Sequence, residues 1–166
     1  NVEHAIVDLT PVFETFKNNV PEIENQDKLN LSLANTRARL RMTTLYYFAG
    51  IHGLLVAGTG NKVEDFGVGF YTKYGDGGVD LSPIADLVKS EVYELGKYLK
   101  VPQSILNAAP TDGLFGDSRT DEDQLGASYD ELEWAMTQVE RNMNSEDFSG
   151  REKVVFDIYK RLNTIN

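Results

Sequence analysis

The chain has 166 residues, of which 41% are hydrophobic and 25% charged, and it contains no cysteine. These values are typical of a folded globular protein, and the length favours one domain. The net charge of −10 argues against binding to nucleic acid through bulk electrostatics, because that requires a basic face. The lack of thiols excludes disulfides and thiolate metal sites and favours the cytoplasm, and no apolar run or leader pattern predicts a membrane span.

The first third of the chain predicts a strand followed by two helices. Residues 5–9 form a short apolar strand, after which Thr10 suits an N-cap and Pro11 the first helical turn. Residues 21–32 are polar with weak periodicity and predict a loop. Residues 33–49 show helical periodicity. Three arginines lie on that helix: Arg37 and Arg41 share one face, and Arg39 lies on the opposite face.

The remaining pattern alternates one further strand with several helices. Residues 54–57 are a compact apolar run between glycines, which is typical of a strand buried on both faces. Ser82-Pro83 predicts a helix start, Val92, Leu95 and Leu99 form the apolar stripe of another helix, and Pro102 opens a short one. Residues 111–125 predict a mobile loop followed by a short acidic helix. Residues 129–143 and 151–165 predict the two closing helices. This alternation favours an α/β fold with a parallel sheet.

The segment "GTGNKVE" follows the apolar run of residues 54–57, where open α/β sheets bind their ligands. Gly58 allows close backbone approach, Thr59 offers a hydroxyl, and Glu64 is a hard oxygen ligand suited to Mg²⁺. The alternative is a glycine turn capped by Thr59 with Glu64 merely solvated. The segment is not a P-loop, because Thr59 stands where that motif requires lysine.

The segment "FYTKYGDGGVDLSP" carries a cation and a carboxylate seven residues apart, Lys73 and Asp80. The glycines between them allow a tight turn, so both groups could face one ligand. The alternative is a surface turn with ordinary charges. Lys89 could contact phosphate, although most lysines at such a place are solvated. For the three arginines of residues 37–41, a solvated basic helix face is the favoured interpretation.

Taken together, the order and spacing of these motifs resemble the NAD synthetase family of the ATP-pyrophosphatase superfamily. The resemblance covers residues 33–135 and is most specific in "GTGNKVE" and "TKYGDGG". It implies a three-layer α/β fold of the adenine-nucleotide-hydrolase-like type, with helices on both faces of a parallel sheet. Members join ammonia to the carboxylate of deamido-NAD after ATP has adenylated it, releasing pyrophosphate and AMP.

The resemblance also implies roles for individual residues. Contacts to ATP are implied for three residues: Thr59, Lys89 and Thr111. A magnesium ligand is implied at Glu64. Contacts to deamido-NAD are implied for three charged residues: Arg39, Lys73 and Asp80. Residues 111–125 resemble the segment that closes over ATP in this family.

Two motifs of the family are absent from the sequence. They are the Ser-Gly-Gly-x-Asp-Ser pyrophosphate loop on the first strand and a His-Lys pair near the C-terminus. Both would fall beyond the ends of the chain, so we expect residues 1–166 to be one synthetase domain that is incomplete at both ends. Without the phosphate cradle we expect these residues alone to be inactive. Family members are homodimers, so a homodimer is expected here.

Three alternatives stay open at this point. The nitrogen donor is ammonia or glutamine-derived, and ammonia is favoured because the sequence shows no amidotransferase domain. Another ATP pyrophosphatase, such as a GMP synthetase, is a second possibility, although "TKYGDGG" counts against it. The third is a catalytically inactive module that binds nucleotide or mediates dimerisation.

Overall fold

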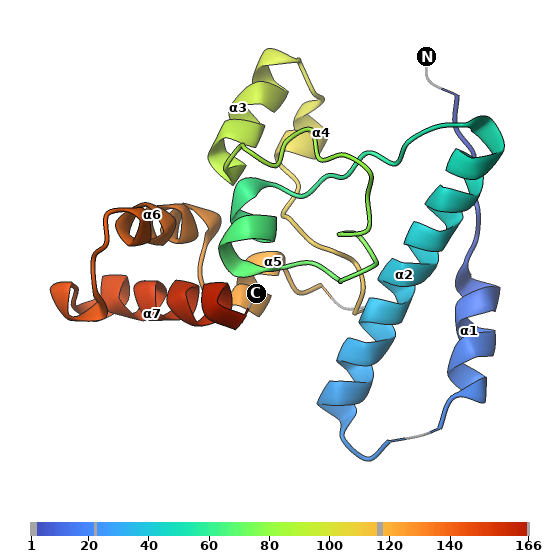
Figure 1. Cartoon of the computed structure of the whole chain (residues 1–166), viewed down its shortest axis with the longest axis horizontal. Helices are drawn as coiled ribbons and strands as arrows, with labels where there is room; N and C mark the ends of the chain where they lie inside the picture. The colour runs from blue at the N-terminus through green and yellow to red at the C-terminus, as the bar shows by residue number, and fades with distance from the viewer. Residues whose placement is uncertain (1–2, 22, 116–117, 166) are drawn as a thin grey trace.

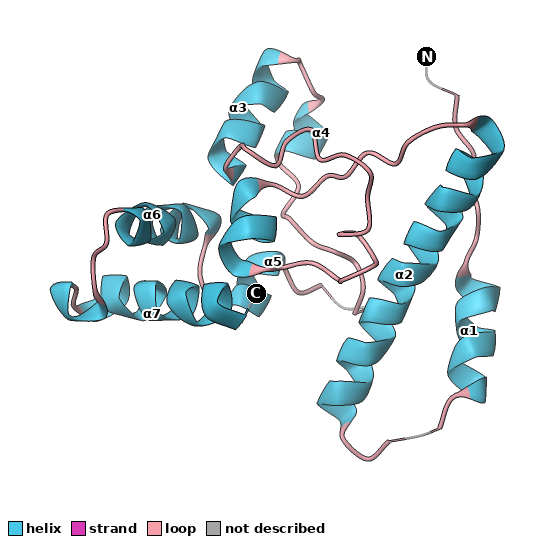
Figure 2. Ribbon diagram, viewed as in Figure 1, coloured by secondary structure: helices cyan, strands magenta, loops and turns pink. Residues whose placement is uncertain are grey.

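The structure is a computed structural model that describes residues 3–21, 23–115 and 118–165. Helices dominate it, joined by long extended and turning segments (Figures 1 and 2). The elements in chain order are α1 Thr10–Asn19, α2 Gln26–His52, the π-helix η1 Lys62–Val68, α3 Lys89–Tyr98, α4 Gln103–Leu106, α5 Asp121–Leu125, α6 Tyr129–Glu140, the 3₁₀ helix η2 Ser145–Asp147 and α7 Gly150–Ile165.

Helices α1 and α2 lie side by side at one edge of the molecule (Figure 1). The side chain of Asn25 caps α2 by accepting a hydrogen bond from the Lys28 N–H at 3.0 Å, and Gly53 ends the helix with a φ of 64°. The predicted helix of residues 33–49 is therefore confirmed. The prediction of a loop over residues 21–32 is wrong from residue 26 onward, because this cap starts the helix earlier.

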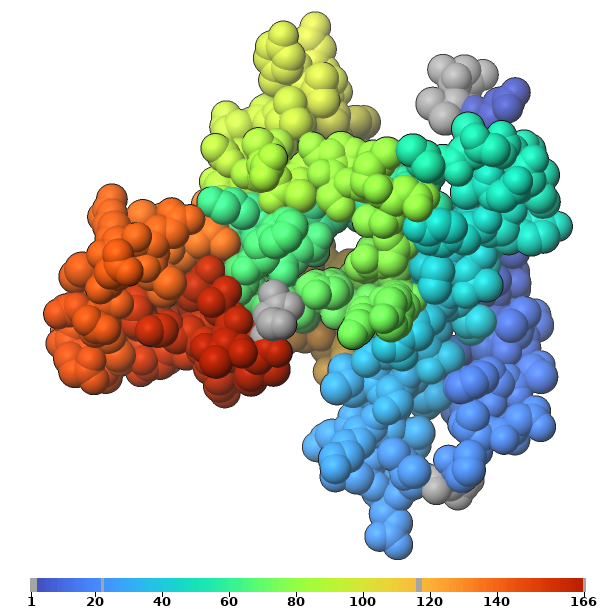
Figure 3. Space-filling view, in the orientation of Figure 1, coloured from blue at the N-terminus to red at the C-terminus, as the bar shows by residue number. Residues whose placement is uncertain are grey.

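The main hydrophobic core lies where α6, α7 and η1 pack together. Val63 of η1, Leu132 of α6 and Phe156 of α7 are each 0% exposed. A smaller cluster, Ala34, Ala38 and Leu114, lies on α2 and the segment that crosses it. Figure 3 shows α6 and α7 on one side of the molecule and α1 and α2 on the other, with the segments between them bridging the middle. The two closing helices that the sequence predicts are confirmed as α6 and α7.

The predicted strands and the sheet are not found in the residues that the structure describes (Figure 2). Residues 5–9 have no regular structure, and Ile6 is 90% exposed. Residues 54–57 meet one neighbour, through a single parallel bridge between Ala57 and Leu81. A strand depends on hydrogen bonds to adjacent strands, and one bridge supplies too few of them. Leu54 and Leu55 are consequently exposed rather than buried on both faces.

The Ser82-Pro83 prediction is also wrong, because turns rather than a helix follow and the helix begins at Lys89. Pro102 precedes α4, as expected, and Asp121–Leu125 is the short acidic helix predicted after the loop. Residues 116 and 117 of that loop lie outside the described residues. Within the described ranges, no helix is long and apolar enough to cross a membrane.

Candidate functional site

The first turn of η1 places the Glu64 carboxylate. The buried side chain of Asn61 accepts hydrogen bonds from the N–H groups of Val63 and Glu64, at 3.0 and 3.1 Å. The Glu64 side chain turns back toward the start of the helix, where its Oε2 accepts from the Asn61 N–H at 3.4 Å. A Cβ at Gly60 would overlap the carboxylate of Asp65, so a larger residue at this position would force that side chain to move. Short π-helical segments often occur at functional sites.

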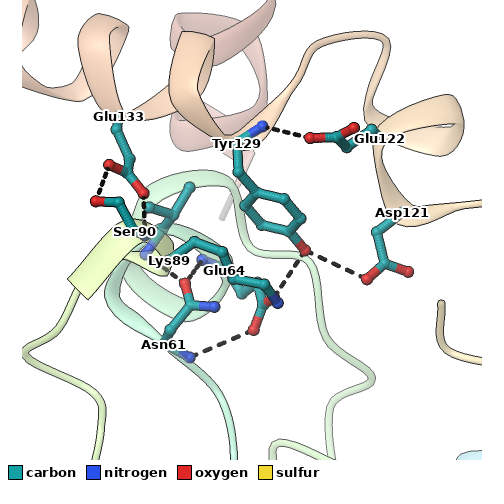
Figure 4. A network of polar contacts seen from close by, with 9 residues as sticks. Asn61, Glu64, Lys89, Ser90, Asp121, Glu122, Tyr129 and Glu133 are labelled. Carbon is teal, nitrogen blue, oxygen red and sulfur yellow. Dashed lines mark hydrogen bonds and ion pairs between the residues drawn. The ribbon is translucent and has the colours of Figure 1, made fainter. Parts of the chain in front are cut away.

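Glu64 forms an ion pair with Lys89, the first residue of α3 (Figure 4). The Lys89 Nζ lies 2.8 Å from the Glu64 Oε1, and the two side chains are 18% and 14% exposed. The ammonium also lies 4.4 Å from the centre of the Tyr129 ring, within the range of a cation–π contact. The pair is therefore shielded from water on several sides, which strengthens its electrostatic interaction.

Tyr129 connects this pair to a second buried carboxylate (Figure 4). Its hydroxyl donates to the Glu64 Oε1 at 2.7 Å and lies 3.3 Å from the Asp121 Oδ2. Burial and the hydrogen bond to Glu64 raise the pKa of Tyr129, so it stays a neutral donor. Asp121 is 7% exposed, and its Oδ1 has no hydrogen-bond partner. Burial also raises the pKa of Asp121.

Asp65 adds a further carboxyl group next to Glu64. Burial, followed by the charges of Glu64 and Asp76, raises the pKa of Asp65 to about 6. The site therefore gathers several carboxyl groups around the Lys89 ammonium. Such a concentration of carboxylates attracts cations and is typical of functional sites as well as of some structural networks.

Glu133 of α6 holds the first turn of α3 (Figure 4). Its two carboxylate oxygens accept from the Ser90 N–H at 2.8 Å and from the Ser90 hydroxyl at 2.7 Å. A carboxylate at this end of a helix satisfies a free N–H group and interacts favourably with the helix dipole. Because Ser90 follows Lys89, this contact also fixes the backbone that carries the lysine.

The three residues predicted to contact ATP lie differently with respect to this cluster. Lys89 is part of it. Thr111 is exposed, and its hydroxyl donates to the Arg119 carbonyl at 3.2 Å; next to it, the Pro110 carbonyl accepts from the Asp121 N–H at 3.1 Å. Thr111 is thus joined through the backbone to the segment that carries Asp121. Thr59 is exposed and lies two residues before Asn61, beside the single parallel bridge.

The residues predicted to contact deamido-NAD form a second group, along α2. The Arg39 Nε donates to the Lys73 carbonyl at 3.1 Å, so the structure brings these two residues together. The carboxylate of Asp80 accepts from the Tyr46 hydroxyl at 3.0 Å and from the Val56 N–H at 2.8 Å. The ammonium of Lys73 and the side chain of Asp80 are exposed parts of this surface.

The other two arginines of α2 hold the segment that carries Thr111. Arg37 donates to the Leu114 carbonyl at 2.7 Å, and Arg41 donates to the Asp112 carbonyl at 3.3 Å. Arg37 also lies 4.0 Å above the ring of Phe13. The interpretation of this helix face as merely solvated is therefore wrong for Arg37, because its guanidinium joins α1, α2 and a distant segment.

A magnesium ion fits this site only if Glu64 supplies one of its ligands and the nucleotide and water supply the others. The described residues contain no group of three side chains able to hold a metal between them. The Glu64 Oε1 already accepts from Lys89 and Tyr129, while Oε2 has, among the described residues, only the long contact to the Asn61 N–H. Mg²⁺ commonly takes one or two carboxylates and completes its shell with water and phosphate oxygens. Glu64 suits that arrangement through Oε2.

Sequence reasoning missed six residues of the site around Glu64 and Lys89: Asn61, Asp65, Ser90, Asp121, Tyr129 and Glu133. Asn61 followed three residues later by Glu64 resembles a capping box, which was a usable signal. Tyr129 and Glu133 lie four apart on α6 and so share a face. No local pattern indicates that this face meets Glu64 and Lys89, which come from segments far away in the sequence.

Comparison with known proteins identifies the family. The family model described as NAD synthase matches residues 1–165. The chain is 44% identical over 132 residues to the NH(3)-dependent NAD(+) synthetase of Methanococcoides burtonii, covering 80% of this chain and 49% of that protein. It is 51% identical over 112 residues to the protein of the same name from Alkaliphilus metalliredigens, covering 68% of this chain and 44% of that one. The chain spans about half the length of these curated relatives.

Among solved structures, the chain is similar to an NMN synthetase from Francisella tularensis, with a TM-score of 0.76 and 33% identity over 96% of this chain and 62% of the other. An NH3-dependent NAD synthetase from Campylobacter jejuni, 24% identical with a TM-score of 0.70 over 96% of this chain and 59% of that one, shares the fold. The match of the family model along nearly the whole sequence, together with these relatives, shows that the chain belongs to the NAD synthase family.

Proposed function

We propose that the chain supplies an ATP site and a dinucleotide site to an enzyme that amidates deamido-NAD to NAD. The nitrogen donor is ammonia, as the names of the curated relatives state for those proteins. The observation that carries the proposal is the Glu64–Lys89 ion pair, which joins two of the residues implied to bind ATP and its metal. An inactive module that binds nucleotide would use the same lysine, so the AMP-release assay described below decides between the two roles.

The chemistry that this site would serve starts from a poor electrophile. A carboxylate oxygen of deamido-NAD attacks the α-phosphorus of ATP, and the bond to pyrophosphate breaks. Ammonia then attacks the acyl carbon, loses a proton, and expels AMP. Both steps gain from fixed positioning of two nucleotides and from positive charge near the phosphates.

Within this scheme Lys89 binds phosphate oxygens with its ammonium group. Glu64 keeps that ammonium in place before the nucleotide arrives, and would hold Mg²⁺ through Oε2, where the ion supplies further neutralisation of phosphate charge. Thr59 and Thr111 offer exposed hydroxyl groups for hydrogen bonds to the same nucleotide.

The second group of residues suits the dinucleotide. Lys73 is an exposed cation beside Arg39, and together they offer positive charge to a pyrophosphate or carboxylate. Asp80, held by Tyr46 and the Val56 N–H, offers a carboxylate to ribose hydroxyls. The surrounding acidic protein makes these local cations more important, because an anionic ligand gains nothing from the net charge.

A mononucleotide product is the second candidate. The likeness to the Francisella tularensis protein, which is named an NMN synthetase, favours it. The two candidates differ only in the substrate that carries the carboxylate, so the same ATP site serves both. Competition between deamido-NAD and nicotinate mononucleotide in one assay decides which of them is preferred.

We also propose the assembly and the sheet that the family resemblance implies. Tyr47 and Ile51 of α2 are 63% and 58% exposed, which leaves apolar surface for a second copy of the chain. A molecular mass in solution that corresponds to a single chain, measured at micromolar protein concentration, would count against a homodimer. The exposed residues Leu54 and Leu55 suit a strand of a parallel sheet, and slow amide exchange over residues 54–57 would support that role.

The test is AMP release from ATP by the natural protein that contains this chain, with ammonia and deamido-NAD supplied. The proposal expects one AMP for each NAD formed, and strict dependence on both added substrates. Lys89→Met removes the ammonium but keeps most of the volume, and we expect it to abolish most of this activity. AMP release that does not depend on deamido-NAD would contradict the proposed substrate.

A further inference from the structure

One side chain, Tyr129, contacts both members of the Glu64–Lys89 pair. It is the first residue of α6 and is 5% exposed. Its hydroxyl donates to the Glu64 Oε1 at 2.7 Å, while the Lys89 Nζ lies 4.4 Å from the centre of its ring (Figure 4). The three residues come from α6, η1 and α3, so Tyr129 joins the three elements at the point where the ion pair forms.

The phenol has one proton and faces two carboxylates. A hydroxyl donates one hydrogen bond, and the shorter contact, 2.7 Å to Glu64 against 3.3 Å to Asp121, receives it. The Glu64 Oε1 thereby accepts from two donors, Tyr129 and Lys89, whereas in the part of the chain that the structure describes Oε2 accepts only from the Asn61 N–H, at 3.4 Å. The orientation of the carboxylate is thus fixed with one oxygen occupied and the other available.

We infer that Tyr129 is the positioning residue of the Glu64–Lys89 pair: its hydroxyl fixes the Glu64 Oε1, which leaves Oε2 for a cation bound with nucleotide, and its ring supports the Lys89 ammonium. The inference deepens the proposed function and rests on it for the identity of the nucleotide. It assigns Tyr129 no contact with substrate, because its atoms act through Glu64 and Lys89.

Tyr129→Phe isolates the hydroxyl. The ring stays in the core cluster and beneath Lys89, and the backbone N–H still donates to the Glu122 Oε1, a bond of 2.9 Å. Tyr159→Phe is the matched control. Tyr159 is 3% exposed in the same core cluster, and in the described structure its hydroxyl makes no hydrogen bond.

The first readout is the affinity for ATP, measured by titration calorimetry with and without Mg²⁺. We expect Tyr129→Phe to reduce the gain in affinity that Mg²⁺ confers by about tenfold, the scale of one lost hydrogen bond to a charged group. Affinity without Mg²⁺ should stay within about twofold of the wild type, because Lys89 and the ring remain. A purely structural defect would weaken binding equally in both conditions.

The second readout needs no nucleotide. The carboxyl carbon resonance of Glu64, followed by NMR in the ligand-free protein, reports directly on the hydrogen bond to Oε1. We expect this resonance to move in Tyr129→Phe and to keep its wild-type position in Tyr159→Phe. An unmoved resonance in Tyr129→Phe would overturn the inference, as would an undiminished effect of Mg²⁺. A wild type that binds no ATP would refute the proposed function, and the Glu64 resonance would then decide the role of Tyr129 by itself.

Discussion

The contact between Glu133 and Ser90 predicts a measurable contribution to stability. Glu133→Ala removes two hydrogen bonds, of 2.8 and 2.7 Å, and leaves the N–H and the hydroxyl of Ser90 in the first turn of α3 without this partner. The net contribution of one hydrogen bond to the free energy of unfolding is about 0.5–1.5 kcal/mol, and loss of a side chain that caps a helix N-terminus costs about 1 kcal/mol. Because Ser90 is exposed and water replaces part of the loss, we expect about 1–2 kcal/mol of destabilisation.

Glu140→Ala on the same helix is the matched control. Glu140 pairs with Lys62 at 3.3 Å, and the two side chains are 61% and 39% exposed. A solvated pair of this kind contributes about 0–1 kcal/mol. Both substitutions replace glutamate by alanine in α6, Glu133 in the middle of the helix and Glu140 at its last residue.

Urea unfolding at pH 7 measures both free energies. The account expects Glu133→Ala to lower the midpoint with an unchanged m-value, and a thermal scan to show a decrease of about 2–4 °C per kcal/mol. Equal destabilisation by the two variants would refute the reasoning, because the Glu133–Ser90 contact would then contribute no more than a surface ion pair.

Three further predictions concern the ligand surface, acid stability and the core. Lys73→Ala should weaken binding of deamido-NAD far more than binding of ATP, as measured by calorimetry, and equal losses would remove Lys73 from the dinucleotide site. The Arg151 hydrogen bond lowers the pKa of Glu131 from 4.5 to about 2, so the stability from this pair is present above pH 4.5 and is lost as pH falls toward 2. The difference in urea midpoint between the wild type and Arg151→Leu should therefore be larger at pH 7 than near pH 2; a difference that does not change with pH would contradict this. Leu132→Ala, at a residue that is 0% exposed, should cost about 2–5 kcal/mol in urea unfolding, and a loss below 1 kcal/mol would argue against the packing described.

The sequence predicts the helices well where an apolar stripe faces a partner. Helices α6 and α7 carry such stripes and cover one core, so their existence follows from periodicity. The start of α2 was missed because its first turns are exposed and lack a stripe. The cap at Asn25 and the acidic Asp27 in the first turn were the signals available there.

The predicted strands are not seen in the described residues for a different reason. An apolar run such as residues 54–57 shows that a segment could be buried, but a strand also needs neighbours to pair with. The described structure provides one parallel bridge, between Ala57 and Leu81. Local sequence cannot supply that information, since it depends on which other segments lie alongside.

The site was predictable in part. The family resemblance singled out Glu64 and Lys89 as site residues. The structure places their charged groups 2.8 Å apart, although the two residues lie 25 positions apart in the sequence. It also places Arg39 against Lys73. Tyr129, Asp121 and Glu133 reach the cluster from α5 and α6, and only the packing of those helices against η1 and α3 reveals them.

The most direct test of the central claim is ammonia-dependent AMP release from ATP and deamido-NAD by the natural protein that contains this chain, with its intact mass determined on the same sample. The account predicts equal amounts of AMP and NAD in the wild type and loss of nearly all activity in Lys89→Met. Wild-type rates in Lys89→Met would contradict it, because the Glu64–Lys89 pair would then have no part in the reaction.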